Sequence, residues 1–199
     1  MAVTKTVSIE RILKVLQEQS ITLIGESRWQ EAKEKIAHLP SGIEKHFIGH
    51  LQTNKAAEVV AAFDCIETVD SIKLARVINH AAAALNKTMP IFLQVNISDD
   101  QAKYGFVPKE LEQVVATVKA MPNIRLDGFM TITAQQDKEI TRSDFTCMKI
   151  LQQKFDLKEL SMGMSADWKI AAAEGATIVR LGTALFGARI LRIDNISIF

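Results

Sequence analysis

Cysteine is scarce in this sequence of 199 residues, with only Cys65 and Cys147 present. The two lie far apart and form no C-x-x-C pair, which argues against a disulfide framework and is typical of a reducing compartment. We interpret both as buried thiols. Long apolar runs are also missing, since none approaches the roughly 18 residues of a membrane span, and the amino terminus lacks the basic-then-apolar order of a signal peptide. We therefore expect a soluble, cytoplasmic protein.

An excess of charge of one sign is missing too. The 24 Lys and Arg residues and the 23 Asp and Glu residues leave a formal net charge of +1, and both signs are mixed along the chain. This balance indicates neither a nucleic-acid surface nor a polybasic membrane patch. Hydrophobic residues make up 48% of the sequence and charged residues 24%, a composition typical of a globular protein rather than a disordered one.

Several common site motifs are absent. The sequence contains no G-x-x-x-x-G-K-[ST], G-x-G-x-x-G or G-x-S-x-G pattern, so it does not indicate a P-loop, a dinucleotide fold or a nucleophile elbow. His46 and His50 are four residues apart, but they lie in a strand-like segment without a carboxylate pattern of the zinc type. We predict that these histidines make hydrogen bonds at a strand end, and we expect no metal site.

Short Val- and Ile-rich runs alternate with stretches of helical period, which is the signature of a parallel α/β fold. The predicted strands are Ala2–Thr4, Thr22–Gly25, His46–Ile48, Cys65–Thr68, Ile91–Asn96, Leu126–Met130, Glu159–Ser161 and Thr177–Leu181. The predicted helices are Ile9–Glu18, Trp29–Ala37, Asn54–Ala62, Ser71–Leu85, Pro108–Met121, Ser143–Phe155 and Asp167–Glu174. About eight strands and seven helices favour a (β/α)8 barrel over an open doubly wound sheet. We expect residues 1–199 to form one domain.

In a barrel, the functional site lies just past the carboxyl ends of the strands. The residues at those positions are Lys5, Glu26, Ser27, His50, Asn96, Met130, Ser161, Gly182 and Thr183. The seventh and eighth loops commonly bind phosphate, and here they carry Ser161–Ser165 and Gly182-Thr183. Thr183 is also predicted to begin a short helix, whose free N–H groups favour an anion. The sequence therefore predicts a site for a phosphate-bearing ligand.

A charge within a predicted buried strand adds to this prediction. Arg180 stands in Ile178-Val179-Arg180-Leu181, and a buried arginine needs an acceptor. A pyridoxal 5′-phosphate (PLP) site needs an amine for the imine, N–H groups and hydroxyls for the phosphate, and a charged side chain for the ring nitrogen. Plainer interpretations remain open: Lys5 as a surface charge, Ser161–Ser165 as a tight turn, and Gly182 as a residue that allows close packing.

Over nearly its whole length the sequence resembles the PLP homeostasis protein family, barrel proteins related to the amino-terminal domain of alanine racemase. The resemblance rests on Ala2–Thr6, Ile24–Glu26, Gln30–Glu31, His46–Lys55, Gln94–Asn96, Lys103–Gly105, Gly128–Met130, Ser161–Asp167 and Val179–Gly187. It implies a barrel of PLP fold type III with an imine on Lys5, with Arg180 at the pyridine nitrogen, and with the phosphate at Ser165, Gly182 and Thr183. Ser27, Asn96 and Met130 complete the predicted cofactor-binding set because each follows a strand.

The sequence departs from the family pattern in two places. The family has Asn after Gly-Glu where this chain has Ser27, so we expect a polar contact near the cofactor to be shortened or bridged by water. The family also begins with a helix ahead of the first strand, whereas this sequence starts on the strand itself. We expect the seam between strands eight and one to be covered either by an upstream helix of a longer natural product or by the apolar tail. The tail residues are Ile190, Leu191, Ile193, Ile196, Ile198 and Phe199.

The resemblance implies a protein that carries or buffers PLP for vitamin B6 homeostasis without catalytic turnover. An arginine opposite the ring nitrogen keeps that nitrogen unprotonated and weakens the cofactor as an electron sink, and we find no second domain to supply an opposing acid or base. Two alternatives stay open: a PLP-dependent racemase or lyase acting on a small amino acid, and a barrel that binds another phosphorylated metabolite without an imine. We expect a monomer whose partners are PLP and apo PLP-dependent enzymes, with neither nucleic acid nor membrane among them.

Overall fold

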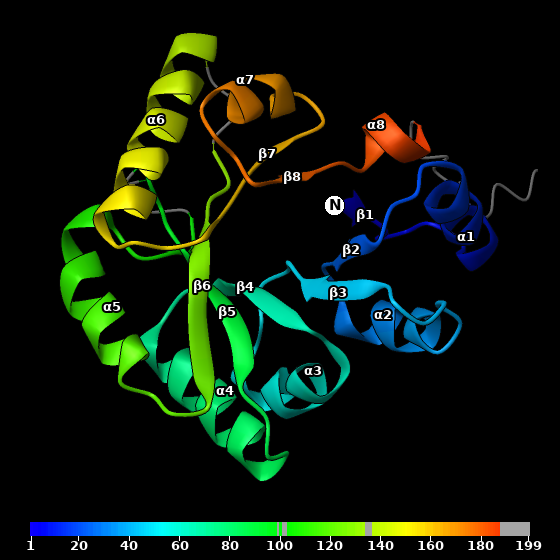
Figure 1. Cartoon of the computed structure of the whole chain (residues 1–199), viewed down its shortest axis with the longest axis horizontal. Helices are drawn as coiled ribbons and strands as arrows, with labels where there is room; N and C mark the ends of the chain where they lie inside the picture. The colour runs from blue at the N-terminus through cyan, green and yellow to red at the C-terminus, as the bar shows by residue number, and fades with distance from the viewer. Residues whose placement is uncertain (99, 101–102, 134–136, 188–199) are drawn as a thin grey trace, which may run out of the picture.

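The eight strands follow one another in chain order around a single parallel sheet (Figure 1). The computed structural model describes residues 1–98, 100, 103–133 and 137–187. Its strands are β1 (Ala2–Val3), β2 (Leu23–Glu26), β3 (Glu44–Phe47), β4 (Cys65–Val69), β5 (Met89–Gln94), β6 (Ile124–Met130), β7 (Glu159–Met164) and β8 (Ile178–Arg180). A further parallel bridge joins Ala2 to Leu181, just past β8. This bridge closes the ring and confirms the predicted (β/α)8 barrel.

Helices cover the outside of the ring of strands (Figure 1). They are α1 (Ile9–Glu18), α2 (Trp29–Ile36), α3 (Ala56–Ala62), α4 (Ile72–Ala84), α5 (Leu111–Lys119), α6 (Lys138–Lys154), α7 (Trp168–Ala173) and the short α8 (Thr183–Phe186). The 3-10 turns η1 (Thr53–Lys55) and η2 (Pro108–Glu110) lead into α3 and α5. The predicted helix Ser143–Phe155 begins earlier, at Lys138, because the Asp137 side chain accepts a hydrogen bond of 2.8 Å from the Glu139 N–H and caps the helix there.

Apolar side chains pack on both faces of the sheet, as a parallel sheet requires. The larger cluster joins strand residues such as Phe47 and Phe129 to helix residues such as Ile78. A separate, smaller cluster consists of Cys65, Phe92, Met130 and Ile178. Because these four residues come from β4, β5, β6 and β8, they meet inside the barrel. The interior is therefore a packed core, and the mouth where the strands end is left for function.

The seam between β8 and β1 is held by backbone hydrogen bonds. The Val3 N–H donates to the Leu181 carbonyl over 2.9 Å, and the Leu181 N–H donates to the Met1 carbonyl over 3.1 Å. On the outer face, Ala2 and Ile24 pack with Ile12 and Leu16 of α1 and with Phe186 of α8. Within the described residues, α1 and α8 pack on this surface, and its coverage by the tail or by an upstream segment stays a prediction. The predicted tail residues lie outside the described part of the chain.

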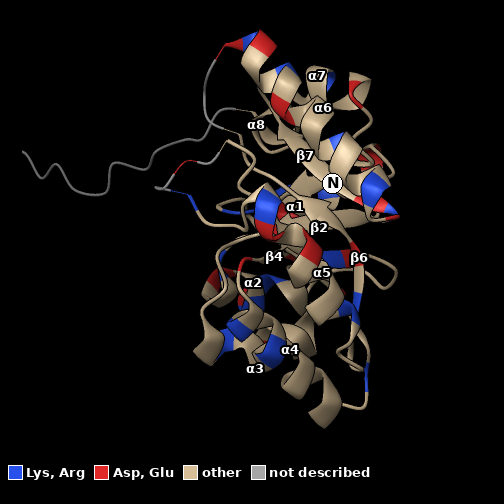
Figure 2. Cartoon of the chain, turned by 90° about the vertical axis from the view of Figure 1, so that its left-hand side faces the viewer, with Lys and Arg blue, Asp and Glu red and all other residues tan. Residues whose placement is uncertain are grey.

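The two cysteines differ in burial: Cys65 is buried, but Cys147 is exposed, so the prediction for Cys147 was wrong. The reason is its place on α6, whose buried side is formed by Thr141, Phe145, Met148 and Gln152. Lys, Arg, Asp and Glu residues are spread over the helices that surround the barrel (Figure 2). Within the described ranges, no helix is long and apolar enough to cross a membrane.

Candidate functional site at the barrel mouth

Lys5 lies in a tight turn directly after β1. The Val7 N–H donates to the Thr4 carbonyl over 3.2 Å, and Thr6 adopts a φ of 62°, in the left-handed region that side chains other than glycine seldom occupy. Lys5 itself is half-buried. A turn in this conformation persists only when neighbouring groups hold it, so the residues around Thr4 and Thr6 decide where the Lys5 amine can reach.

Three side chains from β2 and α2 hold this turn. Lys35 donates from Nζ to the Thr4 carbonyl over 2.7 Å and to Glu26 Oε1 over 3.2 Å. Glu31 Oε1 accepts from the Thr6 N–H and from Lys35 Nζ. The Thr4 hydroxyl donates to Glu26 Oε1 over 2.7 Å. The residues on both sides of Lys5 are thereby fixed to one group, Glu26, Glu31 and Lys35, which we call the turn clamp.

Glu26 is the buried centre of the turn clamp, with 1% of the residue exposed. Its second oxygen, Oε2, has no hydrogen-bond partner among the described residues. Burial raises the pKa of Glu26, against the opposing effects of the Thr4 hydroxyl and the Lys35 charge. Lys35 therefore compensates a costly buried carboxylate while it holds the Lys5 turn.

The clamp gives rise to a testable prediction about Lys35. Replacing Lys35 by methionine removes charge-assisted bonds worth about 1.5–3 kcal/mol each and leaves Glu26 facing Glu31. We expect the fraction of molecules with Lys5 in its competent position to fall, and with it the apparent affinity for an aldehyde ligand such as PLP, by about tenfold or more. Titration of each variant with PLP, followed by absorbance, measures the change.

Lys33→Met on the exposed side of the same helix is the matched control, and Lys35→Arg tests whether the charge restores function. Equal affinity in Lys35→Met and Lys33→Met would contradict the prediction.

Arg180, at the end of β8, points into the barrel and is 4% exposed. Its Nη1 donates to Ser161 Oγ over 2.9 Å and its Nη2 to the Thr131 carbonyl over 2.7 Å. Burial lowers the pKa of Arg180, and the charges of Glu67 and Asp167 oppose that shift. These two bonds use two of the five N–H donors of a guanidinium. The buried arginine predicted from the sequence is therefore present with the acceptors that it needs.

Glu67 on β4 is a buried site residue that the sequence analysis missed. It has no exposed surface, and its Oε2 accepts from the Ser161 hydroxyl over 2.5 Å. Its Oε1 lies 2.6 Å from His46 Nδ1, while His46 Nε2 lies 3.0 Å from Glu44 Oε1. The predicted hydrogen bonding of His46 is thus confirmed. The lone acid in the apolar run Cys65-Ile66-Glu67 was the signal available, and it matches the lone base in β8.

The predicted phosphate residues lie together where β7 and β8 end. Ser165 Oγ accepts from the Ala184 N–H over 3.2 Å, which ties the loop after β7 to the start of α8. Gly182 precedes α8, and Thr183 at its start is exposed. A Cβ added to Gly182 would come no closer than 3.8 Å to Val3, an ordinary contact. Packing within the protein therefore does not require glycine at position 182. A ligand that approaches the backbone closely at this position would require it.

The other three predicted residues have different surroundings. The Asn96 side chain donates to the Asp100 carbonyl over 2.8 Å and accepts from the Asp100 N–H over 3.2 Å, so it organises the loop after β5. Met130 is fully buried in the interior cluster. Ser27 is half-buried after β2, with its carbonyl so near Gly49 that a Cβ there would lie 2.0 Å away. The structure gathers Ser165, Gly182 and Thr183, but it shows Asn96 and Met130 occupied with structural contacts.

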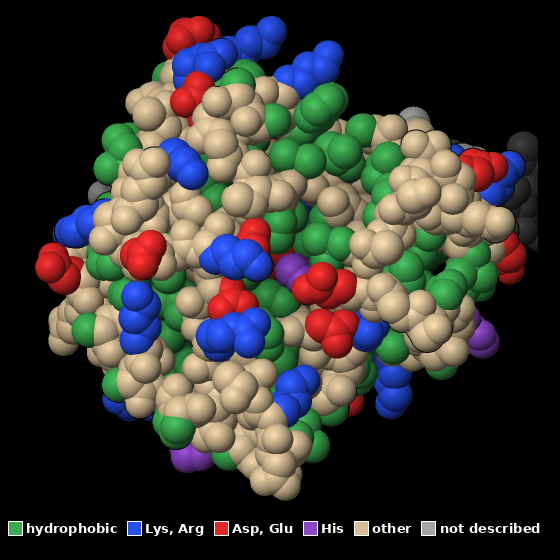
Figure 3. Space-filling view, viewed as in Figure 1, with side chains coloured by type: hydrophobic (Ala, Val, Ile, Leu, Met, Phe, Trp, Pro, Cys, Tyr) green, Lys and Arg blue, Asp and Glu red, His purple; other side chains and the backbone are tan. Residues whose placement is uncertain are grey.

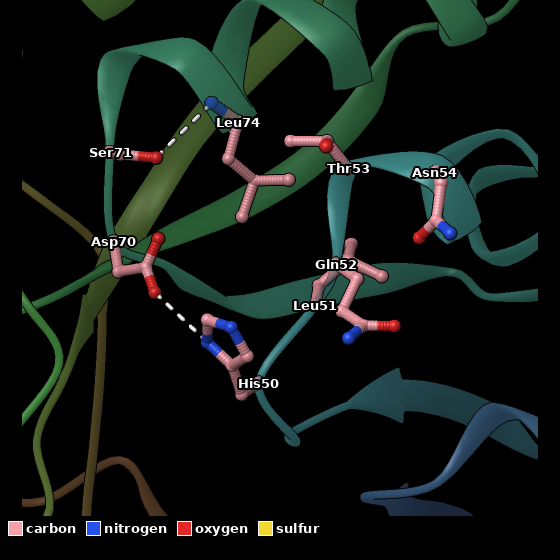
Figure 4. A pocket seen from close by; sticks show the side chains of 8 residues that line it. All are labelled: His50, Leu51, Gln52, Thr53, Asn54, Asp70, Ser71 and Leu74. Carbon is pink, nitrogen blue, oxygen red and sulfur yellow. Dashed lines mark hydrogen bonds and ion pairs between the residues drawn. The ribbon is translucent and has the colours of Figure 1, made fainter.

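A polar pocket opens between the loops after β3 and β4, with a cavity of about 410 Å³ (Figure 4). His50 Nδ1 lies 3.2 Å from Asp70 Oδ2, and the His50 ring stacks on Tyr104 with 4.1 Å between ring centroids. The Ser71 hydroxyl caps α4 by accepting from the Leu74 N–H over 3.2 Å. The described part of the chain contains no group of three or more His, Cys, Asp or Glu able to hold a metal ion.

Comparison with known proteins agrees with this geometry. A family model described as alanine racemase, N-terminal domain, matches residues 1–190. The pyridoxal phosphate homeostasis protein of Vibrio alginolyticus is 36% identical, with 95% of this chain and 85% of that protein covered. The chain belongs to the alanine racemase N-terminal domain family, among the pyridoxal phosphate homeostasis proteins. The protein of the same name from Synechocystis sp. is 38% identical and is covered over 90% of its length. These matches confirm the resemblance predicted from the motifs.

Solved structures of other proteins have a similar fold. PipY of Synechococcus elongatus PCC7942, solved with PLP bound, is 35% identical, with a TM-score of 0.86 over 94% of this chain and 91% of that one. The same protein without PLP gives 0.87. The alanine racemase of Clostridium difficile 630 is 18% identical with a TM-score of 0.77, and this chain covers 53% of it. The last comparison supports the barrel fold alone.

Proposed function

We propose that this protein binds PLP and carries or buffers it in vitamin B6 homeostasis. The observation that carries the proposal is the buried guanidinium of Arg180 at the end of β8, two residues before the Gly182-Thr183 segment that the Ala184 N–H ties to Ser165. The PLP-bound structure of the relative PipY supports it. The residues fit the cofactor, because Gly182 leaves room for a ligand and Arg180 has donors beyond its two internal bonds.

Each site residue has a distinct role in this proposal. The Lys5 amine condenses with the aldehyde of PLP, releasing water and forming an imine. Arg180 donates toward the pyridine nitrogen, and Ser165, Gly182 and Thr183 receive the phosphate. Ser27 stands at the mouth where a polar contact with the ring region is available. Asn96 and Met130 act indirectly, since one orders a loop at the mouth and the other fills the core beneath it.

The charge on Arg180 favours a carrier over a catalyst. A guanidinium facing the pyridine nitrogen keeps that nitrogen unprotonated, which weakens electron withdrawal into the ring. The rival is a racemase or lyase for a small amino acid, which needs an acid or base on each face of the substrate. A turnover that disappears in Lys5→Ala would favour the rival. We further propose that the protein is a cytoplasmic, single-domain monomer that passes PLP to apo PLP-dependent enzymes.

The absorbance spectrum of the purified protein tests the binding proposal. An imine gives a band near ~420 nm that borohydride removes. A phosphate site that holds some other metabolite would give no such band. If the band does not appear after incubation with excess PLP, the proposal is overturned.

The phosphate residues give a second prediction. The double variant Ser165→Ala and Thr183→Val should weaken PLP binding by a few kcal/mol at most, because each change removes one charge-assisted hydrogen bond of about 1.5–3 kcal/mol while backbone donors remain. The imine should still form at high PLP. Titration of the absorbance band measures the affinity, and an unchanged value would remove both side chains from the phosphate site.

A further inference from the structure

A row of polar contacts crosses the barrel interior from one end to the other. Glu44, at the start of β3, lies 3.0 Å from His46, and His46 lies 2.6 Å from Glu67 on β4. Glu67 accepts from Ser161 on β7 over 2.5 Å, and Ser161 accepts from Arg180 on β8 over 2.9 Å. Because β4 and β7 are not neighbours in the sheet, the bond between Glu67 and Ser161 spans the interior.

The two ends of this row differ in their exposure. The Glu44 side chain is 58% exposed, whereas those of His46 and Glu67 are 5% and 0% exposed. Acidic and basic side chains gather around a histidine at the centre of the face where the strands begin (Figure 3). Arg180 lies at the opposite end, under the proposed cofactor site. A group that titrates near one face is thereby joined by hydrogen bonds to the group that would contact the ligand at the other.

Both nitrogens of His46 face carboxylates, which favours the doubly protonated ring with two N–H donors. Burial lowers the pKa of His46, but the hydrogen bonds and charges of Glu67 and Glu44 outweigh it and raise the pKa. The other charged or titratable groups around this end are Cys65, beside His46 in the sheet, Arg125 and Asp127 on β6, and the Met1 amino group, which interacts with Glu67.

We propose that Glu67 and Ser161 are positioning residues that hold Arg180 and couple the protonation of His46 to PLP binding. This inference rests on the proposed function. The Glu67 carboxylate interacts with the charges of both His46 and Arg180. An anionic ligand bound at Arg180 offsets the positive charge of Arg180, so the protonated His46 ring is stabilised more strongly. Ligand binding then raises the pKa of His46. Linkage requires the reverse as well: PLP binds more tightly below the pKa of His46 and more weakly as pH rises through it.

Nuclear magnetic resonance of the imidazole protons tests the coupling directly. The chain has four histidines, and the His46→Gln spectrum assigns the signal of His46. We expect its pKa to rise by at least half a unit on addition of PLP, and the PLP affinity to change with pH by the same factor of about three. Inorganic phosphate, which occupies only the phosphate site, should give a smaller shift.

Ser161→Ala is the decisive variant because it removes the bridging hydroxyl and no charge. In Ser161→Ala, the PLP-induced shift in the pKa of His46 should fall to less than half. In His46→Gln, the pH dependence of the PLP affinity should flatten. His80→Gln, on the exposed side of α4, is the matched control and should behave as the parent protein. In the ligand-free protein, Ser161→Ala should also change the pKa of His46, a readout that needs no cofactor.

The outcomes separate the coupling from the proposed function. If the imine forms but the His46 signal titrates identically with and without PLP, the coupling is wrong and the binding proposal stands. An undiminished shift in Ser161→Ala would overturn the role of the hydroxyl. If no imine forms, the binding proposal fails, and with it the coupling to PLP.

Discussion

Lys5→Ala is expected to abolish covalent attachment of PLP while the barrel remains folded. Lys5 occupies the second position of a turn whose flanking residues, Thr4 and Thr6, are held by the clamp, so replacing its side chain leaves the backbone contacts of the turn in place. The loss should be complete, because an imine needs an amine at that position. Absorbance near ~420 nm before and after borohydride, with peptide mapping of the reduced protein, measures it.

Lys33→Ala is a suitable control for Lys5→Ala, since Lys33 is exposed on α2. It should keep both the band and the label on Lys5. If mapping instead places the label on Lys103 and Lys5 stays unmodified in the parent protein, the assignment of the imine is wrong.

Glu67→Leu is expected to destabilise the fold by about 3–5 kcal/mol, the cost of breaking a buried ion pair by removing one partner. The leucine would remove the carboxylate that accepts from the Ser161 hydroxyl and pairs with His46, and the nearby charge of Arg180 would lose the same counter-charge. Urea unfolding measured by circular dichroism gives the difference in the free energy of unfolding.

Glu44→Gln is the comparison for Glu67→Leu, because it touches the same histidine from a largely exposed position and should cost less than about 1 kcal/mol. Equal losses in the two variants would mean that Glu67 is not the centre of the interior charges. His46→Gln with Glu67→Leu forms a double-mutant cycle that measures how strongly the two side chains interact.

The barrel could be predicted because its signal is repeated along the chain. Each strand is a short apolar run and each helix a longer periodic one, so small errors at the ends did not change the number of strands. The start of α6 was missed because Asp137 caps the helix ahead of the apolar pattern that marks its buried face. Cys147 was misjudged for the related reason that average burial of cysteine says nothing about which side of α6 it occupies.

The site was predictable only in part. Arg180 stood out as a base within an apolar strand, and Gly182 and Thr183 followed from the loop that barrels use for phosphate. Glu67 carried the same kind of signal, but its partnership with Ser161 depends on closure of the sheet, which places β4 opposite β7. The pair Glu31 and Lys35 has the i,i+4 spacing of an ordinary solvated ion pair on a helix. Only its contacts with the turn after β1, which the sequence does not show, give the pair a further role.

The closing bonds of the seam have a consequence for how the protein reaches its active form. Met1 and Val179 are joined by a hydrogen bond although 178 positions separate them. Because closing so long a loop costs entropy before the contact is gained, we expect this contact to form late in folding. Lys5 stands just past one side of the seam and Gly182 just past the other. A cofactor attached to both would act as a clasp across the last junction to form, so the Val3 and Leu181 amides should exchange with deuterium more slowly in the loaded protein.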